Sequence, residues 1–97
     1  MKAVWKNTVL AESNNTIRSQ SNDYFPPESV KKEYLRKSET HTRIMDPYRG
    51  PATYYDIVIG KDINKDAAWY FTEAKGANRQ VNLYVAFDQK KGVTIEK

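Results

Sequence analysis

The stretch TYYDIVI, residues 53–59, has the clearest strand pattern in the chain. Apart from one aspartate it consists of β-branched and aromatic residues, which favour strands. Successive side chains of a strand point to opposite faces, so the stretch separates into two sets. One set is Thr53, Tyr55, Ile57 and Ile59, and the other is Tyr54, Asp56 and Val58. The sequence therefore predicts a strand here, ended by the turn residues Gly60-Lys61-Asp62.

Shorter strand-like segments lie on both sides of this stretch. They cover residues 3–6, 8–12, 16–20, 40–43, 67–71, 83–87 and 93–96, and turn signals separate them. The segment 46–51 contains two prolines and is expected to be a rigid loop, whereas 77–81 is expected to form one helical turn. Many short strands joined by close turns indicate an all-β fold, a small open barrel or sandwich of antiparallel strands with one or two short helices. The 97 residues have the length of a single β-rich domain, residues 1–97.

The segment YFPPESVKKEYL, residues 24–35, combines two adjacent prolines with apolar residues at helical spacing. Pro27 suits the first position of a helix because that position needs no intrahelical N–H bond. Val30, Tyr34 and Leu35 would share one face of such a helix. The segment is therefore expected to form a stiff corner and about two turns of helix that cover an open end of the sheet.

The formal charge of +4 arises from 16 basic and 12 acidic side chains. The expected partner is an unidentified small molecule or protein, and a mild positive charge would favour an anionic one over long range. An ordinary solvated surface is the preferred interpretation of the charge. The basic residues form only two small groups, Lys31-Lys32 with Arg36-Lys37, and Lys90-Lys91. These groups fall short of the dense stripe of a nucleic-acid-binding protein, so we expect at most weak, salt-sensitive binding to nucleic acid.

The absence of cysteine excludes disulfides, thiolate nucleophiles and zinc sites with cysteine ligands. The first residues lack the apolar segment of a secretory signal, and no stretch reaches transmembrane length. A cytoplasmic location without a membrane partner is therefore expected.

The carboxylates of the chain offer one apparent metal motif. Residues 62–66 together with Glu73 imitate the ligand spacing of an EF-hand loop, but Ala67 stands where the sharp turn needs glycine. A β-turn that runs into a strand is the better interpretation. His41, the only histidine, lies in a polar β-branched run and fits a surface residue better than a general base. No metal ligand and no catalytic residue is identified.

Aromatic residues give the remaining functional signal. Most of them are expected to fill the core, but adjacent pairs in one strand point to opposite faces, so a minority should line a ligand site. The two proline-stiffened segments would form the rims of such a site. The hypothesis places five residues there: Arg49, Tyr48, Tyr55, Trp69, and Tyr24 at the edge. The opposing interpretation, in which Arg49 pairs with a surface carboxylate and the aromatics are all core, stays open.

Several phrases taken together resemble domain-of-unknown-function family 427. They are TVLAES, YFPPESV, PYRGPATYYDIVI, NKDAAWYF, and VAF followed by GVTIE, in the order and spacing of that family. The resemblance covers nearly the whole chain and implies a compact β-tent fold, similar to methionine sulfoxide reductase B and the cereblon ligand-binding domain. Many members carry a cysteine where this chain has Asp46, so no role of that cysteine applies here.

Three functions stay open at the level of the sequence. The leading hypothesis is a β module that binds a small ligand or a partner without catalysis and without a cofactor. The second is nucleotidyl transfer, because members of the family are sometimes labelled nucleotidyltransferases. Such enzymes use paired carboxylates and a glycine-rich loop, whereas the four glycines here are scattered singly. The third is weak nucleic-acid binding through the two basic groups.

No structural metal is expected in this chain, although zinc is common among the fold relatives that the resemblance implies. The physical reason is the lack of cysteine thiolates, the usual ligands of structural zinc. Elemental analysis of the purified protein should therefore find no stoichiometric zinc, and one zinc per chain would contradict the prediction.

Overall fold

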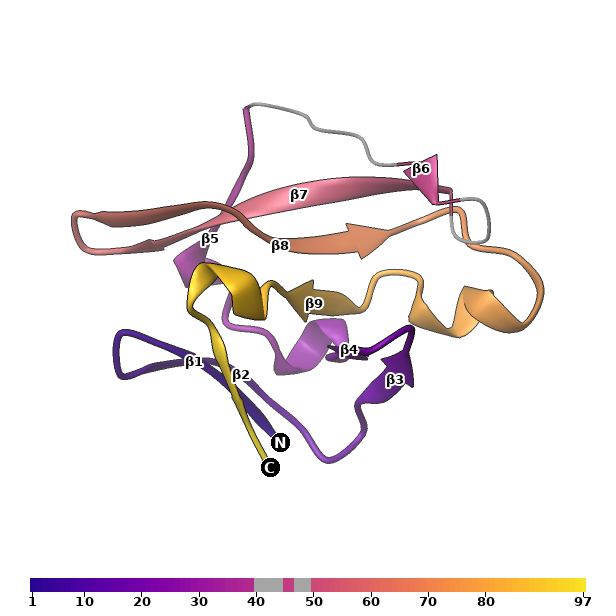
Figure 1. The fold of residues 1–97 in the computed structure, drawn as a ribbon, viewed down its shortest axis with the longest axis horizontal. Helices are drawn as coiled ribbons and strands as arrows, with labels where there is room; N and C mark the ends of the chain where they lie inside the picture. The colour runs from indigo at the N-terminus through magenta and orange to yellow at the C-terminus, as the bar shows by residue number, and fades with distance from the viewer. Residues whose placement is uncertain (40–44, 47–49) are drawn as a thin grey trace.

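Three antiparallel sheets make up the domain in the computed structural model, which describes residues 1–39, 45–46 and 50–97 (Figure 1). All helical segments in these residues are short 3-10 turns, and none of them is long and apolar enough to cross a membrane. The predicted all-β class is confirmed, and the sheets are open.

One sheet contains both the first and the last strand. Its strands are β1 (Lys2–Trp5), β2 (Thr8–Glu12) and β10 (Thr94–Glu96), in the order β10-β1-β2. The turn residues Lys6 and Asn7 have φ angles of 49° and 60°, the left-handed conformation that a two-residue hairpin turn requires. The strands predicted at 3–6, 8–12 and 93–96 are therefore confirmed.

The largest sheet is built on a long hairpin of β7 (Gly50–Ile59) and β8 (Asp62–Phe71). The strands β5 (Leu35–Lys37) and β9 (Val85–Phe87) flank this hairpin in the order β5-β7-β8-β9. The two-residue strand β6 (Met45–Asp46) pairs with the first residues of β7. The predicted central strand therefore lies between two partners of the same sheet.

Both strands of the hairpin are longer than the sequence predicts. β7 begins at Gly50 because Met45 and Asp46 pair with Pro51 and Gly50. The predicted loop 46–51 is therefore wrong for residues 46, 50 and 51, which belong to strands. β8 begins at Asp62 rather than at residue 67, because its polar first residues pair with the apolar end of β7.

A two-stranded sheet of β3 (Ile17–Ser19) and β4 (Asn22–Tyr24) completes the described strands. Phe25 continues β4 and exchanges two backbone hydrogen bonds with Val85 of β9, of 2.8 and 2.9 Å. The strand predicted at 16–20 and the helical turn predicted at 77–81 are confirmed as β3 and as the 3-10 segment η3 (Gly76–Val81). The strand predicted at 40–43 lies outside the described residues.

The proline segment, residues 24–35, does not form the predicted two turns of helix. It forms two 3-10 turns, η1 (Pro27–Ser29) and η2 (Lys32–Tyr34), with an extended link between them. The reason is strand pairing: Val30 bridges to Ala11, and the Lys31 N–H donates to the Leu10 carbonyl at 2.8 Å. A third 3-10 turn, η4 (Gln89–Lys91), leads into the last strand.

Two apolar clusters lie on opposite faces of the β7–β8 hairpin. The first joins the largest sheet to the β10-β1-β2 sheet and contains Leu10, Phe25, Val30, Ile57, Phe87 and Val93, among others. Tyr34 and Leu35 pack against it, as predicted for the covering face of the proline segment. The second cluster is smaller and contains Tyr24, Ala52, Phe71, Ala74, Val81 and Ala86. The hairpin therefore separates two cores.

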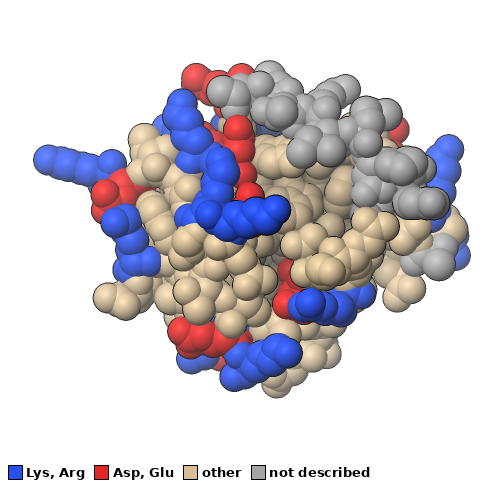
Figure 2. Space-filling view, viewed as in Figure 1, with Lys and Arg blue, Asp and Glu red and all other residues tan. Residues whose placement is uncertain are grey.

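Charged side chains of both signs are interspersed over the face of the molecule in Figure 2. Basic side chains extend from the upper edge to the middle of this face, uncharged residues lie around them, and the basic side chains do not form one continuous stripe across the face.

The β7–β8 ladder is interrupted by a large bulge. Tyr55 pairs with Ala68, but Ile57 pairs with Asn64, so the three residues 65–67 of β8 face the single residue Asp56. Asp66, in the middle of the bulge, has a φ angle of 54°, a left-handed conformation that is uncommon for residues other than glycine. Bulges of this kind re-aim side chains and need local hydrogen bonds to compensate the lost ladder.

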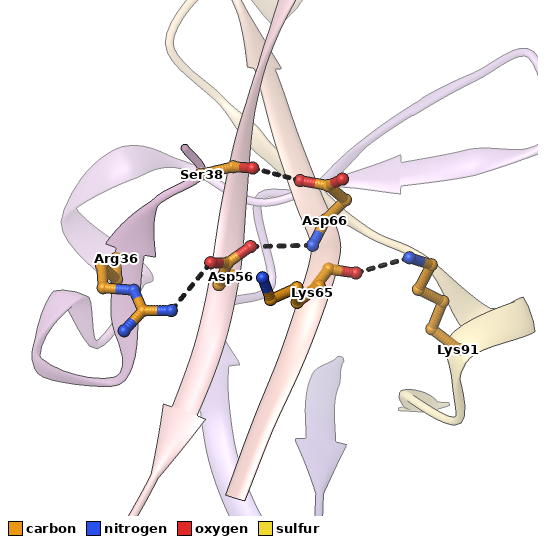
Figure 3. A network of polar contacts seen from close by, with 6 residues as sticks. All are labelled: Arg36, Ser38, Asp56, Lys65, Asp66 and Lys91. Carbon is orange, nitrogen blue, oxygen red and sulfur yellow. Dashed lines mark hydrogen bonds and ion pairs between the residues drawn. The ribbon is translucent and has the colours of Figure 1, made fainter. Parts of the chain in front are cut away.

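The carboxylate of Asp56 provides these bonds (Figure 3). Its Oδ1 accepts a hydrogen bond of 2.9 Å from the Asp66 N–H, and its Oδ2 is 3.1 Å from the Arg36 guanidinium. Only 3% of the Asp56 side chain is exposed, so this negative charge needs its partners. The Ser38 hydroxyl donates to Asp66 Oδ1, and the Lys91 ammonium donates to the Lys65 carbonyl. The bulge is thus fixed from three sides by side chains.

Replacing Asp56 by alanine is expected to lower the free energy of unfolding by about 3 kcal/mol. The loss leaves the Asp66 N–H and the Arg36 guanidinium without this acceptor. Urea denaturation measures the effect, and Asp62→Ala at the exposed hairpin end serves as the matched control, with a change within about 0.5 kcal/mol. Equal losses in the two variants would contradict a special role for Asp56.

Candidate functional site

Aromatic side chains form one cross-strand pair on each face of the hairpin. The rings of Tyr54 and Trp69 lie with centroids 6.2 Å apart, and those of Tyr55 and Tyr70 are stacked at 5.2 Å. The first pair packs against the smaller core and the second against the larger one. The prediction that adjacent aromatics point to opposite faces is therefore confirmed.

The pair of Tyr54 and Trp69 is connected to a third aromatic residue. The indole N–H of Trp69 donates a hydrogen bond of 3.3 Å to the hydroxyl of Tyr24, which comes from β4. Tyr24 is only 2% exposed, and its ring lies 6.3 Å from that of Phe71. Tyr54 and Trp69, in contrast, are only partly buried. Three strands therefore hold this aromatic surface, in which the rings of Tyr54 and Trp69 are partly exposed and the ring of Tyr24 is buried beneath them.

Two carboxylates lie beside Tyr54. The Ser38 N–H donates to the Tyr54 carbonyl at 3.0 Å, and the Ser38 hydroxyl donates to Asp66, so Ser38 links the Asp66 side chain to the backbone of Tyr54. The Asp88 N–H donates to the Ala67 carbonyl at 2.7 Å, which places Asp88 beside the same bulge. We call the group of Tyr54, Trp69, Tyr24, Asp66 and Asp88 the Tyr54 face.

These surroundings affect the ionisation of the tyrosine. Burial raises the pKa of Tyr54 above its ordinary value of 10.0, and the Asp66 and Asp88 carboxylates and Tyr24 raise it further. On the opposite face, burial also raises the pKa of Tyr55, and the neighbouring Tyr70 adds to this through its charge and a side-chain hydrogen bond. Both hydroxyls are therefore neutral at physiological pH, and that of Tyr54 can donate a hydrogen bond to a ligand.

The structure describes three of the five predicted site residues. Tyr24 and Trp69 are in direct contact, as the hypothesis requires. Tyr55 lies on the opposite face of the hairpin from Trp69. Arg49 and Tyr48 lie outside the described residues, so the site of all five residues stays a prediction.

Sequence reasoning did not include Tyr54, Asp66 and Asp88 in the site. The signal for Tyr54 was its position directly opposite Trp69, which becomes visible only when the register of β7 and β8 is known. Asp66 was recognised only as part of an acidic run, and no pattern indicated Asp88.

The acidic run 62–66 belongs to β8, so its residues do not form an EF-hand loop. Among residues 1–39, 45–46 and 50–97, no three histidine, cysteine, aspartate or glutamate side chains gather in a way that would hold a metal ion. His41 and the side chain of Asp46 are outside the described part of the chain.

The fold and the site together define a class: a small, open, all-β domain with a long bulged hairpin and an aromatic surface bordered by carboxylates. The chain belongs to the family described as a domain of unknown function (DUF427), whose family model matches residues 1–96. This match confirms the resemblance drawn from the sequence phrases. No curated protein matches the chain.

The raised pKa values of Tyr54 and Tyr55 lead to a prediction for alkaline solution. In the unfolded chain both hydroxyls ionise near their ordinary value of 10.0, whereas the folded domain keeps them neutral to higher pH. The stability that this difference contributes is fully present below that value and is lost as the pH rises through the folded-state pKa values. Urea denaturation at increasing alkaline pH should show a steeper loss of stability for the native chain than for a Tyr54→Phe, Tyr55→Phe double variant. Identical pH profiles would contradict the prediction.

Proposed function

We propose that the domain is a binding module for a small organic molecule, held by the Tyr54 face. The observation that supports this most directly is the contact between Trp69 and Tyr24 beside the ring of Tyr54. Ligand sites typically combine an apolar aromatic surface with a few polar groups in fixed positions. Here the hydroxyl of Tyr54 and the two carboxylates supply polar groups next to the rings.

The support for this surface is rigid. Tyr24 is buried, and Tyr54 and Trp69 lie directly opposite each other in a paired hairpin. Asp56 holds the neighbouring bulge, and Ser38 holds Asp66. Side chains that are already in place lose little entropy when a ligand arrives, which favours binding.

Nucleotidyl transfer is less well supported than binding. Two-metal chemistry needs carboxylates that converge on one point. Asp62 is exposed at the beginning of β8, whereas Asp66 lies in the bulge and accepts a hydrogen bond from Ser38. We therefore expect the acidic run to stabilise the β7–β8 hairpin rather than to bind metal ions for a reaction.

The binding proposal predicts a ligand that reports on Trp69 and not on Trp5. The chain has two tryptophans, so Trp5→Phe leaves Trp69 as the only one, and Trp69→Phe leaves Trp5, which packs against the other core. A library of aromatic and heterocyclic fragments is screened by ligand-observed NMR. A fragment that binds should change the fluorescence of the Trp5→Phe variant in a saturable way and leave that of Trp69→Phe unchanged.

The neighbouring tyrosines provide a matched pair of variants for the same fragment. Tyr54→Ala should weaken binding about tenfold, because it removes one of the contacting rings. Tyr55→Ala removes the same side chain from the opposite face and should leave the affinity nearly unchanged. If both variants bind with unchanged affinity while still folded, the Tyr54 face is not the binding site.

A further inference from the structure

A leucine occupies an unusual position in the turn between η3 and β9. The Val81 carbonyl accepts a hydrogen bond of 2.9 Å from the Tyr84 N–H, and Asn82 has φ and ψ angles of −56° and 130°. Leu83 follows with a φ angle of 70°. These values define a type II turn, whose third position needs a positive φ and is normally glycine or asparagine. A leucine in this position is strained, because its Cβ crowds the backbone.

The Leu83 side chain gains little burial in return for this strain. It is 56% exposed, and among residues 1–39, 45–46 and 50–97 the only other large apolar side chain that is exposed is Ile63. Ile63, however, lies in regular strand pairing opposite Val58. The other described residues with a positive φ are glycines or polar residues. A backbone outlier that presents an apolar side chain to solvent indicates a role outside the fold.

The turn is held firmly in place. The Leu83 N–H donates to the Phe71 carbonyl at 2.8 Å, at the end of β8. The Asn82 side chain binds both backbone groups of Ala74: it accepts from the N–H at 2.9 Å and donates to the carbonyl at 3.0 Å. Leu83 is therefore presented on a fixed support, which lowers the entropy cost of binding a partner.

Two basic residues lie beside this turn. The Asn82 N–H donates to the Arg79 carbonyl at 3.1 Å, and Lys75 directly follows Ala74, which Asn82 holds. Both basic side chains are exposed, and within the part of the chain that the structure describes neither forms an ion pair. Glu73, the acidic residue nearest in sequence, lies against Gly50 at the start of β7. An exposed leucine with two available cations complements a partner that carries apolar and acidic side chains.

We propose that the turn 81–84 is a docking point for an acidic peptide segment of another protein. An apolar side chain of that segment packs on Leu83 and on the exposed part of Tyr84, and its carboxylates face Lys75 and Arg79. The inference does not depend on the proposed small-molecule site. In Figure 1, η3 and the turn between β7 and β8 lie at opposite ends of the domain, so residues near that hairpin turn provide matched controls.

The first test measures whether Leu83 stabilises the domain. Leu83→Gly removes the side chain and places at this position the residue that best tolerates a positive φ. The variant should unfold at the same urea concentration as the native chain or at a higher one. A lower midpoint would show that the leucine contributes to folding, and it would overturn the inference.

The second test uses short random peptides displayed on phage and selected on the full chain. The enriched sequences should combine acidic with large apolar residues. Synthetic copies are titrated by fluorescence anisotropy, and Leu83→Gly should weaken their binding about tenfold or more. Ile63→Thr removes the other exposed large apolar side chain and should leave the affinity unchanged.

Charge variants test the acidic character of the partner. Arg79→Gln should weaken binding of the same peptides several-fold, and the loss should shrink as salt is added. Lys61→Gln changes the net charge equally in the turn between β7 and β8, and it should leave the affinity unchanged.

Each other outcome contradicts the inference. It is overturned if no peptide is enriched, if the enriched peptides lack acidic residues, or if they bind the native chain and Leu83→Gly equally. Equal losses in Arg79→Gln and Lys61→Gln would show a general charge effect and would also overturn it. Sedimentation should find a monomer, whereas a dimer that Leu83→Gly dissociates would make a second copy the occupant of the turn instead of a peptide.

Discussion

The register of the central hairpin depends on one buried carboxylate. Because Asp56 accepts the Asp66 N–H and pairs with Arg36, three residues of β8 are accommodated opposite one residue of β7. The bulge adds two residues to β8, and because side chains alternate with a period of two, this insertion keeps the two faces of the hairpin unchanged. It shifts the pairing by two residues, so that Trp69 lies directly opposite Tyr54. The candidate site is a consequence of this constraint.

The positions of individual strands could be predicted from the sequence, but the pairing between them could not. Alternation within residues 53–59 assigned Tyr54 and Tyr55 to opposite faces correctly. The bulge could not be predicted, because it depends on Asp56 and Ser38, which are 10 and 28 residues away from Asp66. The proline segment shows the same limit. Its helical spacing was real, but pairing of Val30 and Lys31 with β2 holds the backbone extended between two short turns.

Only part of the candidate site could be predicted from the sequence, because the rest of it depends on how the strands pair. Aromatic composition and the proline-stiffened corner led to Tyr24 and Trp69, which the structure brings into contact. The choice between Tyr54 and Tyr55 as their neighbour required the cross-strand register, which a single sequence does not contain. Asp88 follows β9 and reaches the site only because β9 pairs with β8, so no local motif could have indicated it.

The pairing of the first strand with the last affects how the chain acquires its fold. The two ends of the described chain lie close together (Figure 1), and Lys2 lies opposite Glu96. Val93 and Ile95 contribute to the larger core. During synthesis, the N-terminal hairpin therefore keeps an open edge and an incompletely covered apolar face until residues 93–96 have left the ribosome. Contacts between residues so distant in sequence give a high contact order, which slows folding. The domain is completed only when its last strand has been synthesised, rather than piece by piece along the chain.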